Sequence, residues 1–138
     1  MKELTIEQVR YLAHRLAQEK LQWDEPIPDF NTRFLGKLES CLKTPFQSFG
    51  KKFFYPKFED KAAVLFYLMI KNHPFQNGNK RIAVTSLLTF LHINKKWLRI
   101  HPDDLYQLAV WVAESRPIAK DGTLIAIRDL IHKHRVNL

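Results

Sequence analysis

The ten residues from Asn72 to Arg81, NHPFQNGNKR, lie between the two most apolar runs of the chain. Residues 62–70 (AAVLFYLMI) precede this link, and residues 82–93 (IAVTSLLTFLHI) follow it. Both runs are shorter than the roughly 20 residues of a membrane span, but they are long enough for helices that are buried on most sides. The sequence therefore predicts two buried central helices joined by a polar link. The polar groups of that link need partners, which either the protein or a charged ligand supplies.

The length and the cysteine content bound the class of protein. At 138 residues, the chain fits a single domain that spans residues 1–138. The N-terminal stretch has acidic and polar residues inside its apolar pattern, which does not fit a secretory signal. Cys41 is the only cysteine, so it cannot form an internal disulfide. Together these features predict a cytoplasmic protein without a membrane span.

The formal net charge of +8 favours acidic partners. The basic residues are nevertheless scattered along the chain in singles, pairs and one short cluster near its end. Such a charge supports solubility and a general preference for anions, but charge alone is weak evidence for nucleic-acid binding. We therefore do not expect direct nucleic-acid binding to be the main function.

Two helices are predicted in the first third of the chain. Thr5 and Gln8 have the spacing of a capping box. The apolar residues that then recur at helical spacing are Val9, Leu12, Ala13 and Leu16. This helix should end before Pro26, with Gln22–Asp29 as a loop. A second helix should bury one apolar face, on which Cys41 is a small core residue and not a nucleophile. That face comprises Phe34, Leu35, Leu38, Cys41 and Leu42.

Residues 44–57 (TPFQSFGKKFFYPK) predict a short hairpin or an extended flap. Gly50 and Lys51 are flanked by aromatic residues, with Pro45 and Pro56 as outer stops. Exposed rings on such a flap would suit the docking of another chain by strand addition. The alternative, which we favour for most of these rings, is that they cover the core. The rings are those of Phe49, Phe53, Phe54 and Tyr55.

The second half of the chain predicts further helices. Asn94–Trp97 should form a turn, a fifth helix should open at Pro102, and Arg116-Pro117 should break it. Asp121-Gly122 predicts another turn before the last helix. About six helices and one short β-hairpin flap give an all-α bundle with two buried central helices.

The link offers a seat for an anion at the start of the second central helix. The first central helix should run over Phe58–Lys71, and Gly78 then allows a sharp turn because it tolerates positive φ. The second helix should begin at about Asn79, where unpaired backbone N–H groups and the positive end of the dipole suit phosphate. Lys80 and Arg81 add two cations about 100° apart around that helix, so they could hold different phosphates of one nucleotide.

His73 provides the link with a group that accepts a proton near neutral pH. Beside a bound polyphosphate, such a histidine can deprotonate an attacking hydroxyl. Phosphoryl or nucleotidyl transfer needs this base, cations and usually a divalent metal. Asn77 could hold a metal through its amide oxygen or bond a phosphate, and Phe75 should anchor the loop in the core. Each residue alone has a structural explanation, and only their combination favours catalysis.

Residues 73–81 (HPFQNGNKR) resemble the signature of the Fic/Doc superfamily, His-x-Phe-x-Asp/Glu-Gly-Asn-Gly/Lys-Arg. Lys80 and the short chain resemble the death-on-curing (Doc) branch, whose members are toxins of toxin–antitoxin pairs. The similarity extends roughly from Leu4 to Leu130. It includes Leu38-Glu39-Ser40, Tyr55-Pro56 and Lys61-Ala62-Ala63.

The resemblance implies a role for each matching residue. His73 would be the general base on a protein hydroxyl and Phe75 the core anchor. The anion-binding nest for the ATP phosphates would comprise Gly78, Asn79, Lys80 and Arg81. Members with glycine at the place of Lys80 typically transfer AMP, whereas those with lysine resemble the Doc toxin, which transfers a phosphate to a threonine of elongation factor Tu. The flap that would dock the target comprises Phe49, Gly50, Lys51, Lys52 and Phe53.

The chain departs from the family pattern at two positions. Asn77 stands where the family usually has an acid that holds Mg²⁺, and a neutral amide is a poorer ligand for this cation. Val84 stands where some Fic proteins carry a further arginine. No segment matches the inhibitory Ser/Thr-x-x-x-Glu-Gly/Asn helix of many Fic proteins. The resemblance then implies an inhibitor in trans, an acidic antitoxin that suits the +8 charge.

Three functions stay open at this point. The first is an ATP-dependent protein kinase of the Doc type that acts on a translation factor as a growth-arrest toxin. The second is a Fic-type transferase that attaches AMP to a protein hydroxyl. The third is a binding module for nucleotide or antitoxin that has lost catalysis through Asn77.

Overall fold

The computed structural model describes residues 1–21 and 26–138. The chain begins with consecutive helical segments: α1 (Ile6–Gln8), a π-helical segment (Val9–His14) and α2 (Arg15–Lys20). The predicted capping box is confirmed, because Gln8 N donates to Thr5 Oγ1 at 3.2 Å and Thr5 N donates to Gln8 Oε1 at 3.0 Å. The predicted loop at Gln22–Asp29 lies partly outside the described residues, and its described part, 26–29, has no regular secondary structure.

The apolar stripe predicted for this first helix is half wrong. Val9 and Ala13 are buried as expected, but the side chains of Leu12 and Leu16 are 49% and 38% exposed. Ala17, four residues after Ala13, is buried in their place. The π-helical segment explains the change, because its i→i+5 hydrogen bonds widen the turn and advance the buried face by four residues at each step.

The second helix is shorter than the sequence predicts. A 3₁₀ turn (Phe30–Thr32) comes first, and α3 (Lys37–Lys43) begins only after Gly36, which has φ +86°. Gly36 N donates to Glu39 Oε2 at 2.9 Å and fixes this start. Leu38, Cys41 and Leu42 are buried as predicted. The prediction was wrong for Phe34 and Leu35, which precede the helix and are exposed.

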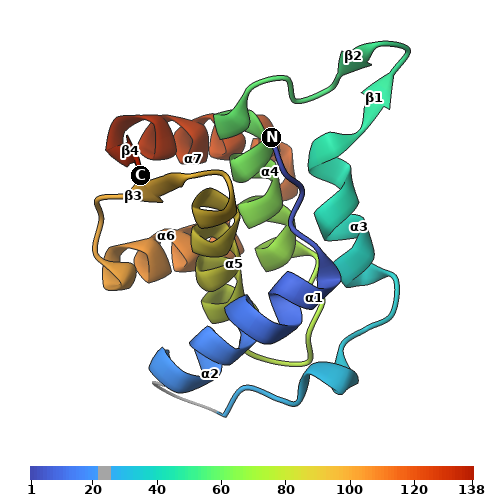
Figure 1. The fold of residues 1–138 in the computed structure, drawn as a ribbon, viewed down its shortest axis with the longest axis vertical. Coiled ribbons are helices and arrows are strands. Elements are labelled where there is room, and N and C mark those ends of the chain that lie inside the picture. The colour runs from blue at the N-terminus through green and yellow to red at the C-terminus, as the bar shows by residue number, and fades with distance from the viewer. Residues whose placement is uncertain (22–25) are drawn as a thin grey trace.

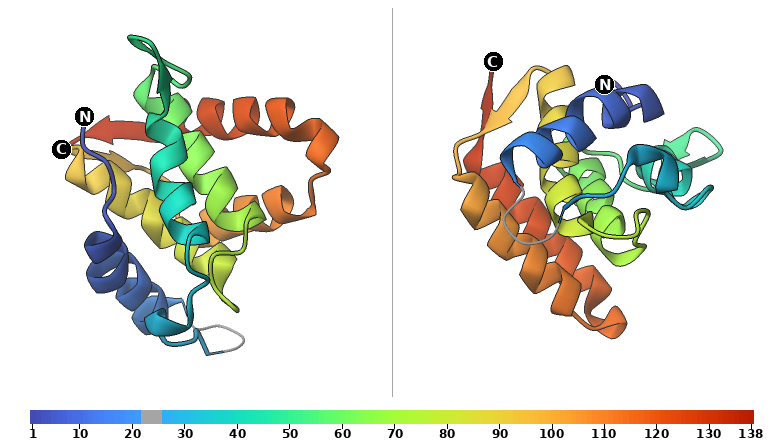
Figure 2. Two further views of the ribbon diagram at one scale, coloured as in Figure 1. Left: turned by 90° about the vertical axis from the view of Figure 1, so that its right-hand side faces the viewer. Right: turned by 90° about the horizontal axis from the view of Figure 1, so that it is seen from below.

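The two central helices are confirmed. They are α4 (Phe58–Lys71) and α5 (Asn79–Ile93), and they pack against each other in the middle of the molecule (Figure 1). Buried aliphatic and aromatic side chains on several faces of both helices form the core. Around them lie the N-terminal helices, α3, α6 and α7, as the two further views in Figure 2 show. The all-α class is therefore confirmed.

The predicted hairpin is present but projects from the molecule. After a 3₁₀ turn (Thr44–Phe46), β1 (Ser48–Phe49) pairs antiparallel with β2 (Lys52–Phe53) around Gly50. Figure 1 shows this hairpin extending beyond the helices, near the start of α4. The expectation that most of its rings cover the core is wrong, because three of the four aromatic side chains are exposed. These three are Phe49, Phe53 and Phe54.

The C-terminal part differs from the prediction in two details. The segment Asn94–Trp97 is only partly a turn, because β3 (Lys96–Leu98) pairs with β4 (Arg135–Asn137) in a second small sheet. Helix α6 (Pro102–Glu114) ends before Arg116-Pro117 as expected, and a 3₁₀ turn (Pro117–Ala119) follows. Asp121-Gly122 is not a turn, since it lies in the first turn of α7 (Lys120–His134).

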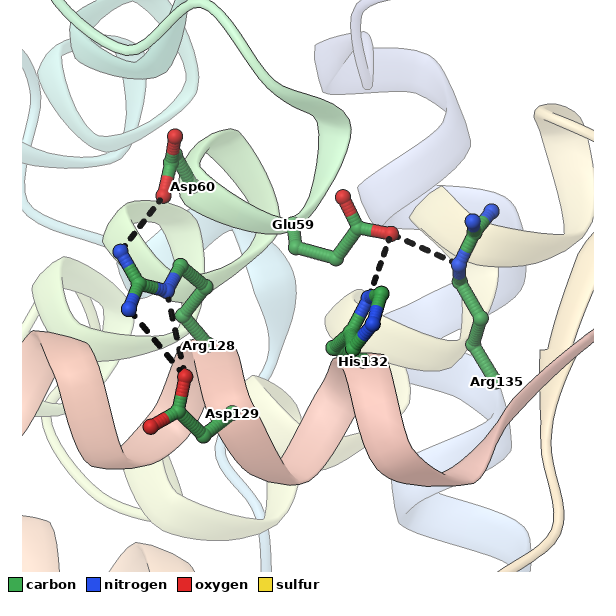
Figure 3. A network of polar contacts seen from close by, with 6 residues as sticks. All are labelled: Glu59, Asp60, Arg128, Asp129, His132 and Arg135. Atoms are coloured by element: carbon green, nitrogen blue, oxygen red, sulfur yellow. Dashed lines mark hydrogen bonds and ion pairs between the residues drawn. The ribbon is translucent and has the colours of Figure 1, made fainter.

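A network of ion pairs holds α7 and β4 on the beginning of α4 (Figure 3). Glu59 Oε1 lies 2.7 Å from Arg135 Nε and 3.7 Å from His132 Nδ1. Asp60 Oδ1 lies 3.7 Å from Arg128 Nη1. The two acids that the sequence places at the positive end of α4 thus have cationic partners across the bundle. Among the described helices, none combines the length and the apolar character that crossing a bilayer requires.

Candidate functional site

A pocket of about 400 Å³ lies at the link between the end of α4 and the start of α5. The link between these helices supplies most of its lining, and α6 supplies one side chain. The lining residues are His73, Gln76, Asn77, Gly78, Asn79, Lys80, Arg81 and Tyr106. The residues that the sequence singles out as base, cations and turn are therefore brought together around one cavity.

Asn79 fastens the link at its centre. Its Oδ1 accepts from Phe75 N at 2.9 Å, and its Nδ2 donates to Phe75 O at 2.9 Å. These two bonds satisfy both backbone polar groups of a buried residue. Asn79, which was predicted to belong to an anion-binding nest, is the first residue of α5. Its side-chain amide makes the two bonds that shape the loop.

Gly78 makes the turn that sets the direction of α5. Its φ is +76°, in the left-handed region that glycine adopts without strain. A Cβ at this position would lie 2.9 Å from Ile27 Cγ1, closer than side chains approach one another. Both the backbone conformation and the available space therefore require glycine here, and the predicted sharp turn is confirmed.

Phe75 is buried, with 1% of its surface exposed. Its ring lies 5.6 Å from the ring of His14 and 5.9 Å from that of Phe30, measured between centroids. A further tie comes from Phe34, whose backbone N donates to Pro74 O at 3.0 Å. The link is thereby attached to the N-terminal helix and to the segment before α3, as an anchor residue should achieve.

His73 lies exposed at the edge of the pocket, one residue beyond the cap of α4. Its φ of +47° is unusual for a residue other than glycine, and such strained positions are common at functional sites. Its Nδ1 lies 3.4 Å from Asn79 Nδ2, which can only donate. If Nδ1 of His73 carries the proton and Nε2 acts as the base, Nδ1 cannot accept a hydrogen bond from Asn79 Nδ2. The contact that is lost is weak, because the two nitrogens lie far apart for a hydrogen bond.

The two cations differ in their surroundings. Lys80 is half-buried, and Arg81 is 5% exposed. Arg81 Nη1 donates to Leu21 O at 3.2 Å, so part of the guanidinium already holds the end of the N-terminal helix. Lys80 is consequently the more solvent-accessible of the two charges, and Arg81 is a buried charge in the wall of the pocket.

The described residues do not form a protein-held Mg²⁺ site. Asn77 offers one amide oxygen, and this oxygen accepts from Gly78 N at 2.8 Å. No group of three or more His, Cys, Asp or Glu side chains within residues 1–21 and 26–138 is arranged to hold a metal ion. The donor set of the pocket thus fits an anion better than a divalent cation.

The hairpin residues predicted to dock the target lie away from this pocket. The hairpin precedes the first residue of α4 (Figure 1), whereas residues after the last residue of α4 line the pocket. The 14 residues of α4 separate the two by about 20 Å along the helix axis. Phe49, Gly50, Lys51, Lys52 and Phe53 therefore do not line the cavity that holds His73.

Tyr106 lines the pocket from α6, and no sequence motif predicts this position. The contact spans about 30 positions of the chain, and a tyrosine on a helix carries no local signal of such a role. Ile27 and Leu21, which touch the glycine turn and Arg81, were likewise not selected. Their roles depend on how the N-terminal helix packs against α5.

Comparison with known proteins places this geometry in a family. A family model described as the Fic/DOC family matches residues 3–91. Among curated proteins, Toxin Doc of Mycolicibacterium smegmatis (strain ATCC 700084 / mc(2)155) is 36% identical over 66 residues, which are 48% of this chain and 51% of that protein. The chain thus spans about half the length of the curated relative it matches. The matched region covers more than half of the chain and includes α4, the whole link and all but the last two residues of α5, so the chain belongs to the Fic/DOC family.

Proposed function

We propose that the chain is a Doc-type toxin that transfers a phosphate from ATP to a protein hydroxyl. The observation that carries this proposal is the pocket in which His73, Lys80, Arg81 and the start of α5 face one cavity of about 400 Å³. Members of the Fic/DOC family are typically ATP-using transferases, and the similarity to Toxin Doc supports the toxin reading.

The residues support a simple division of work. Lys80, Arg81 and the backbone N–H groups at the start of α5 bind the phosphate oxygens. The imidazole of His73 accepts the proton of the target hydroxyl, whose oxygen then attacks the γ-phosphorus. The bond between that phosphorus and the oxygen of the β-phosphate breaks, and ADP leaves with the electron pair. No step in this sequence uses a metal held by Asn77.

The partners in this proposal are a protein substrate and an antitoxin. The substrate is a translation factor such as elongation factor Tu, and the antitoxin is an acidic protein that binds in trans. Both follow from the family resemblance and from the net charge of +8. A cytoplasmic location is proposed on the same grounds.

Labelled ATP tests the reaction. The protein is incubated with cell extract or purified elongation factor Tu, and with ATP labelled at either the α or the γ phosphorus. We expect label on protein only from the γ position, and none with His73→Ala. Label that arrives only from the α position would replace phosphate transfer by AMP transfer, the second candidate. Lys80→Gly is the companion variant, because glycine is typical of the AMP-transferring members.

Asn77→Asp tests the third candidate, a binding module without catalysis. A carboxylate at position 77 restores the usual Mg²⁺ ligand of the family. If the native chain transfers no label and Asn77→Asp does, the native protein is a binding module. If the native chain and Asn77→Asp transfer label at similar rates in the presence of EDTA, asparagine at position 77 does not impair catalysis.

A further inference from the structure

The β1–β2 hairpin presents an unusual combination of side chains to solvent. The side chains of three phenylalanines are exposed: Phe49 by 82%, Phe54 by 60% and Phe53 by 49%. Three exposed lysines share the segment, and residues 44–57 contain no acid. These lysines are Lys51, Lys52 and Lys57. Large exposed rings beside unpaired cations are uncommon on a surface without a ligand.

The nearest acids along the chain do not neutralise these lysines. Glu59 and Asp60 follow the hairpin, but they pair with Arg135 and Arg128 of the C-terminal segment (Figure 3). No ion pair of Lys51, Lys52 or Lys57 occurs among the residues that the structure describes. The hairpin therefore keeps a positive field of its own.

A buried lysine holds the hairpin in place. Lys61, on the first turn of α4, is 1% exposed, and its Nζ donates to Tyr55 O. Its Nζ also lies 4.0 Å from the centroid of the Phe53 ring and 5.3 Å from that of Phe46. Burial of this ammonium lowers its pKa, and the nearby negative charge of Asp60 opposes this shift in part. The hairpin is thus fixed at its base, which reduces the entropy cost of binding a ligand.

The dimensions of the hairpin decide between two kinds of ligand. Strand addition needs a free edge, and each strand here has only two residues, which offers very few backbone hydrogen bonds. Exposed aromatic rings beside lysines, with no acidic residue among them, are instead typical of proteins that bind single-stranded nucleic acid. In such proteins the bases stack on aromatic rings and the lysines contact phosphates. A duplex keeps its bases stacked on one another and cannot use the rings.

We propose that the β1–β2 hairpin is a second binding site, for single-stranded nucleic acid. It is separate from the pocket at the α4–α5 link and does not depend on the proposed phosphate transfer. Phe49 and Phe54 stack on bases, and Lys51 and Lys52 contact the phosphates on either side.

Fluorescence anisotropy with a labelled 12-nucleotide oligo(U) tests this site directly on the full chain. We expect binding that weakens with salt at a logarithmic slope of about −1.4, since Lys51 and Lys52 each release about 0.7 counterion from a single strand. Phe49→Ser with Phe54→Ser should weaken binding at least about tenfold. Lys51→Glu with Lys52→Glu should weaken it further and flatten the slope.

Matched controls separate this site from general attraction to a basic protein. Lys2→Glu with Lys133→Glu changes two exposed lysines elsewhere and alters the net charge by the same amount. We expect these controls to bind oligo(U) within about twofold of the native chain. Equal losses in the control and hairpin variants would overturn the proposal, as would binding of a 12-base-pair duplex as tight as that of oligo(U). Binding of poly-glutamate that also needs the two rings would reassign the hairpin to an acidic protein partner. Circular dichroism of each variant shows that the helices are retained.

Discussion

Asn79 is the residue whose side chain holds the link together. Asn79→Ala should lower the free energy of unfolding by about 1–3 kcal/mol, because the buried N–H and C=O of Phe75 lose their partners. Urea unfolding followed by tryptophan fluorescence measures this difference. Asn31→Ala is the control, since Asn31 is exposed and its change should stay within about 0.5 kcal/mol. Equal stabilities of the two variants would mean that the loop does not depend on the amide of Asn79.

Alanine substitutions at two glycines should change the stability of the protein in opposite directions. Gly78→Ala should destabilise the protein by at least about 1–2 kcal/mol, because the left-handed conformation strains any Cβ and Ile27 leaves no room for one. Gly122→Ala should stabilise it by about 0.5–1 kcal/mol, since Gly122 lies in α7 with ordinary φ and nothing within 4 Å of an added Cβ. Thermal unfolding of both variants gives the two signs, and the same sign for both would contradict this account of the turn.

At the scale of elements, His14 couples the N-terminal helix to the link. The ring is buried against Phe30 and Phe75, and its Nε2 lies 2.9 Å from Pro28 O. Burial lowers the pKa of His14, and the Pro28 carbonyl and Asp29 oppose this shift only in part. The folded protein therefore resists protonation of this ring more than the unfolded chain does.

The sign of the resulting pH dependence follows from linkage. The unfolded chain binds a proton at His14 near pH 6.5, the ordinary pKa of histidine, whereas the folded chain does so only at lower pH. The stability that neutral His14 contributes is thus complete above about pH 6.5 and decreases as the pH falls from there toward the lower, folded pKa. Unfolding free energies measured between pH 7.5 and pH 5 should fall less steeply in His14→Gln than in the native chain. An unchanged slope would show that His14 does not titrate on unfolding.

The elements that the sequence predicts well are those that local signals define. The body of α4 follows from the uninterrupted apolar run over residues 62–70, and the start of α5 follows from Gly78. Signals of this kind fail where the partner is distant in the chain. The β3–β4 sheet joins residues about 40 positions apart, and the π-helical segment shifts the face that packs on α5, so neither leaves a local pattern.

The same distinction applies to the candidate site. The site could be predicted largely because its base, turn and cations are contiguous from His73 to Arg81. Tyr106 could not, since α6 reaches the pocket only through the packing of the bundle. The exposure of the hairpin rings could not be read from their composition either, because aromatic side chains on a two-residue strand suit a core or a surface equally well.

At the scale of the whole molecule, Cys41 reports on whether the bundle opens as a unit. It is the only cysteine, it is fully buried on α3, and burial raises its pKa to about 11. Because the thiolate is the reactive form, alkylation by iodoacetamide at pH 8.5 should be slower in the folded protein than in urea by roughly two orders of magnitude from the pKa alone. Burial slows it further, so labelling should follow the fraction of unfolded protein through a urea titration. Tryptophan fluorescence supplies the independent measure of that fraction. If Cys41 reacts well before the fluorescence changes, α3 and the hairpin beyond it detach from the central helices before the rest of the molecule unfolds.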